Sequence, residues 1–320
     1  MFFILEFFSR KVKKTSKVKS QRLGNEKMSF LNYFINGLSL GSVYAIIALG
    51  YTMVYGIAKM LNFAHGDIIM VGAFAVFFCM KSGVNAIFSI LISMVICTLL
   101  GIVIEKVAYK PLRKANSSLA VLITAIGVSY LLQNLALLLF GADARSFTSV
   151  VSLKPIKLFD GQVSITGEAI VTIITCVVIM IALTLFVNKT KAGQAMQAVS
   201  EDKGAAQLMG INVNATITLT FAIGSALAAI AGALMCSAYP NLTPYSGTMP
   251  GIKAFVAAVF GGIGSIPGAM IGGLLIGVIE IIGKAYISSQ MTDAIVFAIL
   301  IIVLLVKPSG ILGKNVQEKV

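Results

Sequence analysis

The sequence predicts an all-α, polytopic membrane protein with about eight transmembrane segments. Of its 320 residues, 58% are hydrophobic and 12% are charged, whereas soluble domains have roughly 45–50% apolar and about 25% charged residues. Many apolar stretches approach the length of about 20 residues that spans a bilayer core. So much apolar surface cannot be hidden inside one water-soluble core, so lipid is the expected solvent for most of the chain.

The net charge of +13 does not indicate a nucleic-acid-binding protein, because Lys and Arg gather at segment ends rather than on one amphipathic face. An excess of basic residues in short loops is typical of the cytoplasmic side of a membrane protein. We therefore place three basic connections in the cytoplasm, namely 105–117, 188–214 and 307–319. The connection 141–168 has mixed charge and fits the outside.

The expected elements follow in order along the chain. Residues 1–29 are basic, and we interpret them as a disordered cytoplasmic tail that could also bind anionic lipid headgroups. Residues 30–315 form the predicted membrane-spanning domain. Its apolar segments are expected at 31–56, 68–80, 85–104, 118–140, 169–187, 215–237, 252–284 and 292–306, of which the seventh is interrupted.

Counting crossings exposes a conflict in the first half. A cytoplasmic N-terminus followed by three full crossings would leave the basic connection 105–117 outside. Either the N-terminus is outside, or one segment does not cross fully. The short stretch 68–80 is the best candidate for a broken or re-entrant helix, since irregular backbone at membrane depth survives where it is buried in protein or faces water.

A second break lies at 261–268, where glycines and Pro267, which lacks a backbone donor, interrupt an apolar run. Two interrupted segments in corresponding halves are typical of transporters built from internal repeats, with the pathway at the repeat interface. We therefore predict an internal repeat and assign a translocation path or helix breaks to Asn62, His65, Gly66, Asp67, Gly262, Gly264 and Pro267.

His65 is the one histidine of the chain, and with Asp67 it forms a His–carboxylate pair. Catalysis is not favoured, because no supported Ser or Cys nucleophile and no second metal ligand accompany the pair. We interpret Asn62 and Asp67 as residues that satisfy backbone donors at a helix start. Contact with a passing substrate is a compatible alternative. No metal or cofactor is predicted.

Acidic residues are costly at the membrane centre, at about 2.5–3.5 kcal/mol on insertion scales. Glu105, Glu280 and Asp293 fall near predicted segment ends or breaks. We therefore expect them to reach the membrane interface.

The connection 188–214 reads NKTKAGQAMQAVSEDKGAAQLMGINVN. Residues 201–209 have helix-forming composition, and Gly210 would end the helix as a C-terminal cap. This pattern predicts a short helix parallel to the membrane. A plain interfacial connector is the alternative.

The stretch from Asn32 to Phe77, with GLSLGSVYAIIALGYTMVYGI and NFAHGDIIMVGAF, resembles LivH-type permeases of bacterial branched-chain amino-acid ABC importers. AVSEDKGAAQLMGINVN, PGIKAFVAAVFGGIGSIPGAMIGGLLIGVIE and the ending KPSGILGK are similar to landmarks of the same family. The resemblance covers about residues 29–315 and involves separate motifs in the family's order.

The resemblance implies a permease subunit that carries leucine, isoleucine and valine by alternating access across a bacterial cell membrane. Its implied partners are a second homologous permease subunit, two ABC ATPase subunits, an extracytoplasmic solute-binding protein and membrane lipid. The connection 188–214 resembles the coupling loop that docks into the ATPase. This loop is centred on Glu201, Asp202, Ala205, Ala206 and Gly210.

The sequence contains no Gly-x-x-x-x-Gly-Lys-Ser/Thr run, so a partner is expected to hydrolyse ATP and the chain is not predicted to be an enzyme. Related permeases carry urea, short amides or sugars, and no side-chain pattern here distinguishes these solutes. A secondary transporter or channel is a further alternative.

Overall fold

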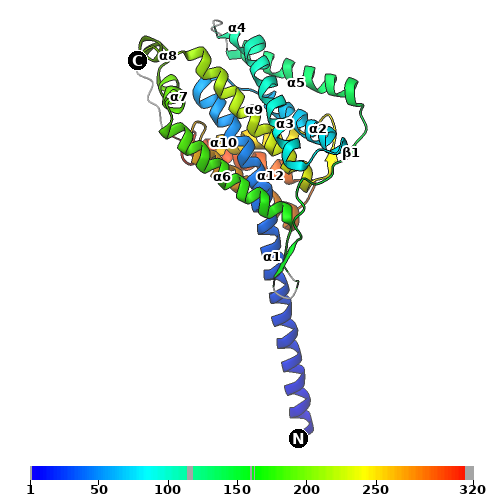
Figure 1. The fold of residues 1–320 in the computed structure, drawn as a ribbon. Coiled ribbons are helices and arrows are strands. Elements are labelled where there is room, and N and C mark those ends of the chain that lie inside the picture. The colour runs from blue at the N-terminus through cyan, green and yellow to red at the C-terminus, as the bar shows by residue number, and fades with distance from the viewer. Residues whose placement is uncertain (1, 114–117, 159–160, 162, 314–320) are drawn as a thin grey trace.

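The computed structural model describes residues 2–113, 118–158, 161 and 163–313. Its helices form a bundle, from which the first part of α1 extends (Figure 1). The helices are α1 (Phe2–Ala58), α2 (His65–Lys81), α3 (Ala86–Ile104), the π-helix η1 (Glu105–Tyr109), α4 (Lys110–Leu112), α5 (Ser118–Phe140), α6 (Gly167–Lys189), α7 (Lys191–Glu201), α8 (Lys203–Leu208), α9 (Val213–Ala238), α10 (Thr248–Gly261), α11 (Ile266–Tyr286) and α12 (Thr292–Val306).

Short strands occur only in connections of the described chain. Strands β1 (Arg145–Ser146) and β4 (Asn241–Leu242) pair antiparallel, with Arg145 opposite Leu242. Strands β2 (Ile156–Leu158) and β3 (Val163–Ile165) form a second antiparallel ribbon, with Ile156 opposite Ile165. The first ribbon ties the connection after α5 to the connection after α9.

The predicted polytopic helical fold is confirmed. In the described part of the chain, six helices are long and apolar enough to cross a membrane, while α10 and α12 are shorter apolar helices. The interrupted seventh segment is α10 followed by α11, and every other predicted segment corresponds to one helix. Two of them, α2 and α10, border the predicted breaks.

The centre of the bundle is formed by α1 and α9, with α11 packed closely on α1. A Cβ added to Gly277 would lie 2.2 Å from the Cα of Gly41, and one added to Gly273 would lie 2.4 Å from the Cα of Ala45. The backbones of α1 and α11 therefore touch. Such close approach through small residues is how helices pack where lipid removes the hydrophobic driving force.

The direction of α1 bears on the conflict in the crossing count. At one end, the Asn32 side chain accepts a hydrogen bond from the backbone of Ser164 in β3, at 3.1 Å. At the other end, Lys203 donates to the carbonyl of Ala58, at 2.9 Å. Thus α1 runs from the connection predicted outside to the basic connection 188–214.

The three basic connections meet at this same end. Arg113 donates to Asn214, at 2.6 Å, and the backbone of Ile311 donates to Phe260 at the end of α10, at 2.9 Å. If these connections are cytoplasmic, α1 begins outside, and Figure 1 places the start of α1 far from α4 and α8. The cytoplasmic position of residues 1–29 stays a prediction, and α2, with 17 residues, is not among the six helices long enough to cross.

In the structure, residues 2–29 are the first part of α1. Their sequence contains no proline and only one glycine, Gly24. Lys, Arg and Leu, which are frequent in this segment, favour helix intrinsically. The local sequence is therefore compatible with a helix in this segment.

Candidate functional site

The first predicted break lies inside the bundle. Asn62, His65 and Asp67 are all buried. The ring of His65 meets Tyr51 of α1 edge-on, with the centroids 4.7 Å apart, and its Nε2 has no hydrogen-bond partner among the described residues. Asp67 accepts from Gln133 of α5, at 2.9 Å. The break therefore joins α1, α2 and α5.

The sequence suggested that the Asn62 side chain caps α2, but the structure shows that it does not. The cap position is Ala64, and no side chain accepts a hydrogen bond there. Instead, Asn62 Oδ1 accepts from the hydroxyl of Tyr109 in η1, at 2.9 Å. Asp67 does lie in the first turn of α2, where a negative charge is favoured by the helix dipole. Gly66 packs against the backbone of Gly247.

The second break is a tight turn between α10 and α11. Gly262 and Gly264 have φ values of 105° and 95°, which favour glycine because they lie in a region that L side chains rarely adopt. Ser265 caps α11 by accepting from the backbone of Gly268, at 3.2 Å. Pro267 lies in the first turn of α11, where its missing donor costs little.

The chain's C-terminal segment completes the end of α10. The backbone amides of Ile311 and Leu312 donate to the carbonyls of Phe260 and Gly261, each at 2.9 Å. The last carbonyls of a helix lack partners within that helix. The KPSGILGK motif therefore closes α10, a role that its sequence alone did not reveal.

The two breaks meet in the middle of the bundle. Phe63 of the first break packs on Phe255 of α10, with the ring centroids 5.5 Å apart. Tyr51, Asn62 and Ile263 border the same narrow space, which has no room for a water molecule. The predicted path residues are thus brought together, and the contact between them is closed.

Larger cavities lie on either side of this closed contact along α1. Toward the end of α1 at Asn32, which we call the outer end, Tyr44 borders a cavity of about 340 Å³. Toward the end with the basic connections, Tyr55 and Ala58 border a cavity of about 890 Å³. Along α1, the outer cavity therefore lies beside Tyr44, the closed contact beside Tyr51 and the inner cavity beside Tyr55.

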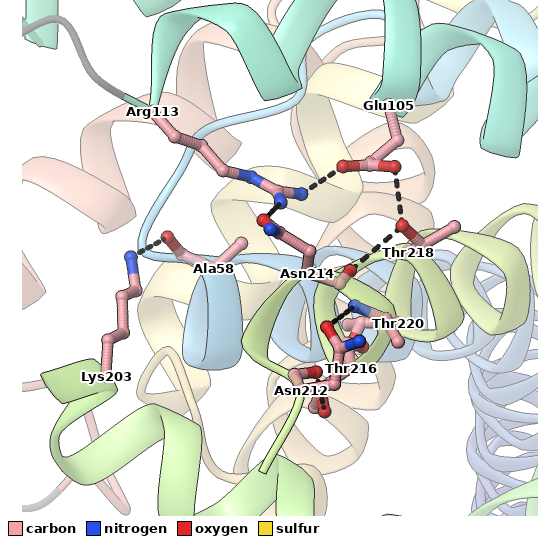
Figure 2. Close-up of polar contacts among 10 residues, drawn as sticks. Ala58, Glu105, Arg113, Lys203, Asn212, Asn214, Thr216, Thr218 and Thr220 are labelled. Carbon is pink, nitrogen blue, oxygen red and sulfur yellow. Dashed lines mark hydrogen bonds and ion pairs between the residues drawn. The ribbon is translucent and has the colours of Figure 1, made fainter. Parts of the chain in front are cut away.

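A polar network borders the inner cavity, and Figure 2 shows its contacts. Glu105 of η1 is fully buried, pairs with Arg113 and accepts from the Thr218 hydroxyl of α9, at 2.7 Å. Arg113 in turn donates to Asn214, at 2.6 Å. Glu105 lies near the basic connections, and these partners replace water and allow its burial.

Lys203 connects the 188–214 connection to the end of α1 through its bond to Ala58 (Figure 2). Partial burial lowers the pKa of Lys203, and the positive charges of Arg113 and Lys59 act in the same direction. Lys59 itself has a φ of 57°, a left-handed conformation often found just after a helix end. The link therefore joins α8 directly to the start of the first break.

The connection 188–214 contains two helices rather than one. The amphipathic α7 buries Gly193, Met196 and Val199, and it ends at Glu201. Asp202 then caps α8 by accepting from the backbones of Gly204 and Ala205, at 2.7 and 3.0 Å. Glu201 thus belongs to the preceding helix, because the capping preference of Asp202 starts a new one.

Gly210 ends α8 as predicted. It has a φ of 85°, its amide donates to Gln207, and the amide of Ile211 donates to Ala206. This pair of bonds is the Schellman motif, which satisfies the last carbonyls of a helix. Ala206 is buried and Ala205 is exposed, so the two alanines face opposite environments.

The outward face of α8 presents two large apolar side chains. Leu208 is 91% exposed and Met209 is 83% exposed. They stand together between two defined caps at the end of the molecule with the basic connections. Clustered exposed apolar side chains on a folded element indicate a protein or membrane contact.

A second ion network, at the outer cavity, was missed from the sequence. Glu280 of α11 is buried within the protein. It accepts from Tyr44, Lys253 and Lys284, at 2.8, 2.8 and 2.7 Å. Asp293 is half-exposed and pairs with Lys253, at 2.7 Å. The available signal was Lys253 itself, since a lysine inside an apolar segment needs a partner.

A membrane bundle in which two interrupted helices meet between an outer and an inner cavity has the architecture of a solute permease. The family described as "Branched-chain amino acid transport system / permease component" matches residues 33–304. The chain belongs to this family.

Individual relatives are similar over nearly their whole length. LivH of Salmonella typhimurium, a high-affinity branched-chain amino acid transport permease, is 43% identical over 93% of this chain and 100% of its own. BraD of Pseudomonas aeruginosa, described in the same words, is 42% identical over 91% and 98%. A probable LivH of Methanocaldococcus jannaschii is 30% identical over 85% and 89%.

Among solved structures, PsaBC from Streptococcus pneumoniae in complex with Fab aligns with a TM-score of 0.47 and 14% identity. The alignment covers 91% of this chain and 97% of that one.

Proposed function

We propose that this chain is the permease subunit of an ATP-driven importer that carries leucine, isoleucine and valine across a bacterial cell membrane. The observation that carries the proposal is α8, a capped helix with exposed Leu208 and Met209, in a chain whose relatives are named as branched-chain amino acid permeases. A short helix with an apolar tip offers a partner a compact docking feature.

The proposed partners are two ABC ATPase subunits at α8, a second homologous permease subunit and an extracytoplasmic solute-binding protein. The ATPase closes on ATP binding and moves α8. Lys203 passes this movement to Ala58 and Lys59 through its hydrogen bond. The segment 59–64 then shifts and carries with it Asn62 and Phe63, which belong to the closed contact between the breaks.

Alternating access follows if this movement opens the closed contact toward one cavity at a time. Such a shift needs only that ATP and solute favour different arrangements. Asn62, His65, Gly66, Asp67, Gly262, Gly264 and Pro267 are the proposed moving parts, because they form the two breaks. The arrangement described here is interpreted as a state in which the middle is closed.

Uptake of labelled leucine, isoleucine and valine, measured in cells with and without this subunit, tests the solute. We expect uptake of all three to fall when the subunit is removed and to return with the restored gene. Urea, short amides and other solutes are tested in the same cells. Unchanged uptake of the three amino acids, with loss of urea uptake, would overturn the assignment.

Met209→Glu tests the docking role of α8. A charge at the centre of an apolar contact should weaken assembly with the ATPase by at least about tenfold, measured by co-purification and by ATP-dependent uptake. Met291→Glu is the matched control, because Met291 is also exposed, at 57%, but lies before α12 at the opposite end. Undiminished assembly and uptake in Met209→Glu would contradict the coupling assignment.

A further inference from the structure

The outer cavity combines charges with an apolar wall. Its volume is about 340 Å³, and it lies among α1, α9, α10 and α11. Leu40 and Met235 line its buried inner wall, and Tyr239 and Asn241 are exposed at its rim. A cavity of this size is at the lower end of the range for small-molecule sites, roughly 300–1,000 Å³.

Glu280 receives more donors than a structural link between helices requires. Tyr44 joins it to α1, and Lys253 joins it to α10. Both donors are buried, and Lys253 also pairs with Asp293. These contacts already hold the carboxylate between three helices. The third donor, Lys284, lies one turn away on the same helix, so it adds no connection between helices.

Lys284 is the exchangeable member of the network. Its side chain is 40% exposed, whereas that of Lys253 is 8% exposed. An ion pair that is partly open to water contributes little to stability, so Lys284 can leave Glu280 at small cost. Lys284 and Glu280 both line the outer cavity, which places an acid and a base beside the same volume.

We propose that this cavity binds a free α-amino acid with an apolar side chain. The ammonium group of the solute takes the place of Lys284 on Glu280, and the carboxylate group pairs with the released Lys284. The side chain of the solute lies against Leu40, Met235 and Pro250. The proposal deepens the proposed function, on which it rests for the choice of solute.

Charge balance supports a zwitterion. Lys253, Lys284, Glu280 and Asp293 together carry no net charge, and a zwitterion leaves that sum unchanged. A simple amine would leave Lys284 unpaired, and a simple carboxylate would find Glu280 already occupied. A zwitterion therefore makes two charge-assisted contacts where an amine or a carboxylate makes only one, whereas apolar contacts distinguish side chains only weakly.

Direct binding of labelled L-leucine tests the cavity in the complete importer, purified in lipid nanodiscs without the solute-binding protein. Lys284→Gln should weaken binding by about tenfold or more, as expected for loss of a charge-assisted hydrogen bond. Lys284→Arg should retain most of it. Lys154→Gln, which removes an exposed positive charge from the connection after α5, is the control and should bind like the unaltered importer.

Two leucine analogues separate recognition from general damage. Isoamylamine lacks the carboxylate, and 4-methylpentanoate lacks the ammonium. The unaltered importer should bind leucine at least about tenfold more tightly than either analogue. In Lys284→Gln the preference for leucine over isoamylamine should disappear, because the residue that reads the carboxylate is gone. A merely destabilised protein would lose binding of leucine without losing this preference.

Failure of this proposal is distinguishable from failure of the proposed function. If the unaltered importer takes up leucine but binds none without the solute-binding protein, or if Lys284→Gln binds leucine normally, the cavity assignment is wrong and the transport function stands. If cells take up all three branched-chain amino acids equally well without the subunit, the proposed function is wrong.

Discussion

Helices α1 and α6 are both long and apolar enough to span the membrane, but α1 lies at the centre of the bundle and α6 at its periphery. Helix α6 is the more apolar, yet only 22% of its most apolar stretch is buried within the chain, compared with 89% for α1. The less apolar helix therefore occupies the centre. The difference arises because lipid already satisfies apolar side chains, so protein–protein packing depends on small residues and polar contacts.

The contact surfaces of the two helices show this division. Helix α1 meets α11 through Gly41 and Ala45 and bonds to Glu280 through Tyr44. Helix α6 exposes Ile174 and Val178. Sequence hydropathy identifies both helices but does not indicate which of them lies inside. Three substitutions test this distinction between a packed centre and an apolar periphery.

Glu105→Ala should lower stability the most. Helix α3 is mostly exposed and continues into η1, where buried Glu105 bonds to Thr218 of the central helix α9. The substitution leaves Arg113 without its ion pair. Removing one partner of a buried pair costs about 3–5 kcal/mol, so thermal unfolding of the purified protein should shift strongly downward. Asp143→Ala removes an exposed carboxylate and should leave the melting temperature unchanged. Equal effects of the two substitutions would disprove the anchoring role.

Gly277→Ala should have the next largest effect. Its new Cβ would lie 2.2 Å from the backbone of Gly41, so α1 and α11 must separate. Overpacking of this kind costs about 1–3 kcal/mol, again measured as a lower melting temperature. Gly127→Ala is the control on α5, where an added Cβ meets no atom within 4 Å. A neutral Gly277→Ala would show that the central packing is loose.

Val178→Leu on α6 should have the smallest effect. Val178 is 58% exposed, and lipid should accept the extra methylene with a change within about 0.5 kcal/mol. Cys176→Leu, two residues away at a buried position, should lower the melting temperature clearly by overpacking. A large loss in Val178→Leu within the assembled importer would instead show that a partner subunit covers this face of α6.

Local patterns predicted much of the candidate site. Gly210 ends α8 because its positive φ suits glycine, and the breaks at Asn62–Asp67 and Gly262–Pro267 lie where the short-range signals placed them. The partners of these residues were not predictable. Asn62 bonds Tyr109, which lies 47 residues away, and no local preference specifies such a pairing.

The sequence by itself determined that the chain is a membrane protein, where its apolar helices lie and that Gly210 ends a connecting helix. These properties depend on hydropathy and on hydrogen bonds within a few residues. The tertiary structure alone decided which helices are central, at which end α1 begins, and that Glu280 lies beside Lys253 and Lys284. A buried charge is stable only where other helices supply its partners, so its position depends on how those helices pack.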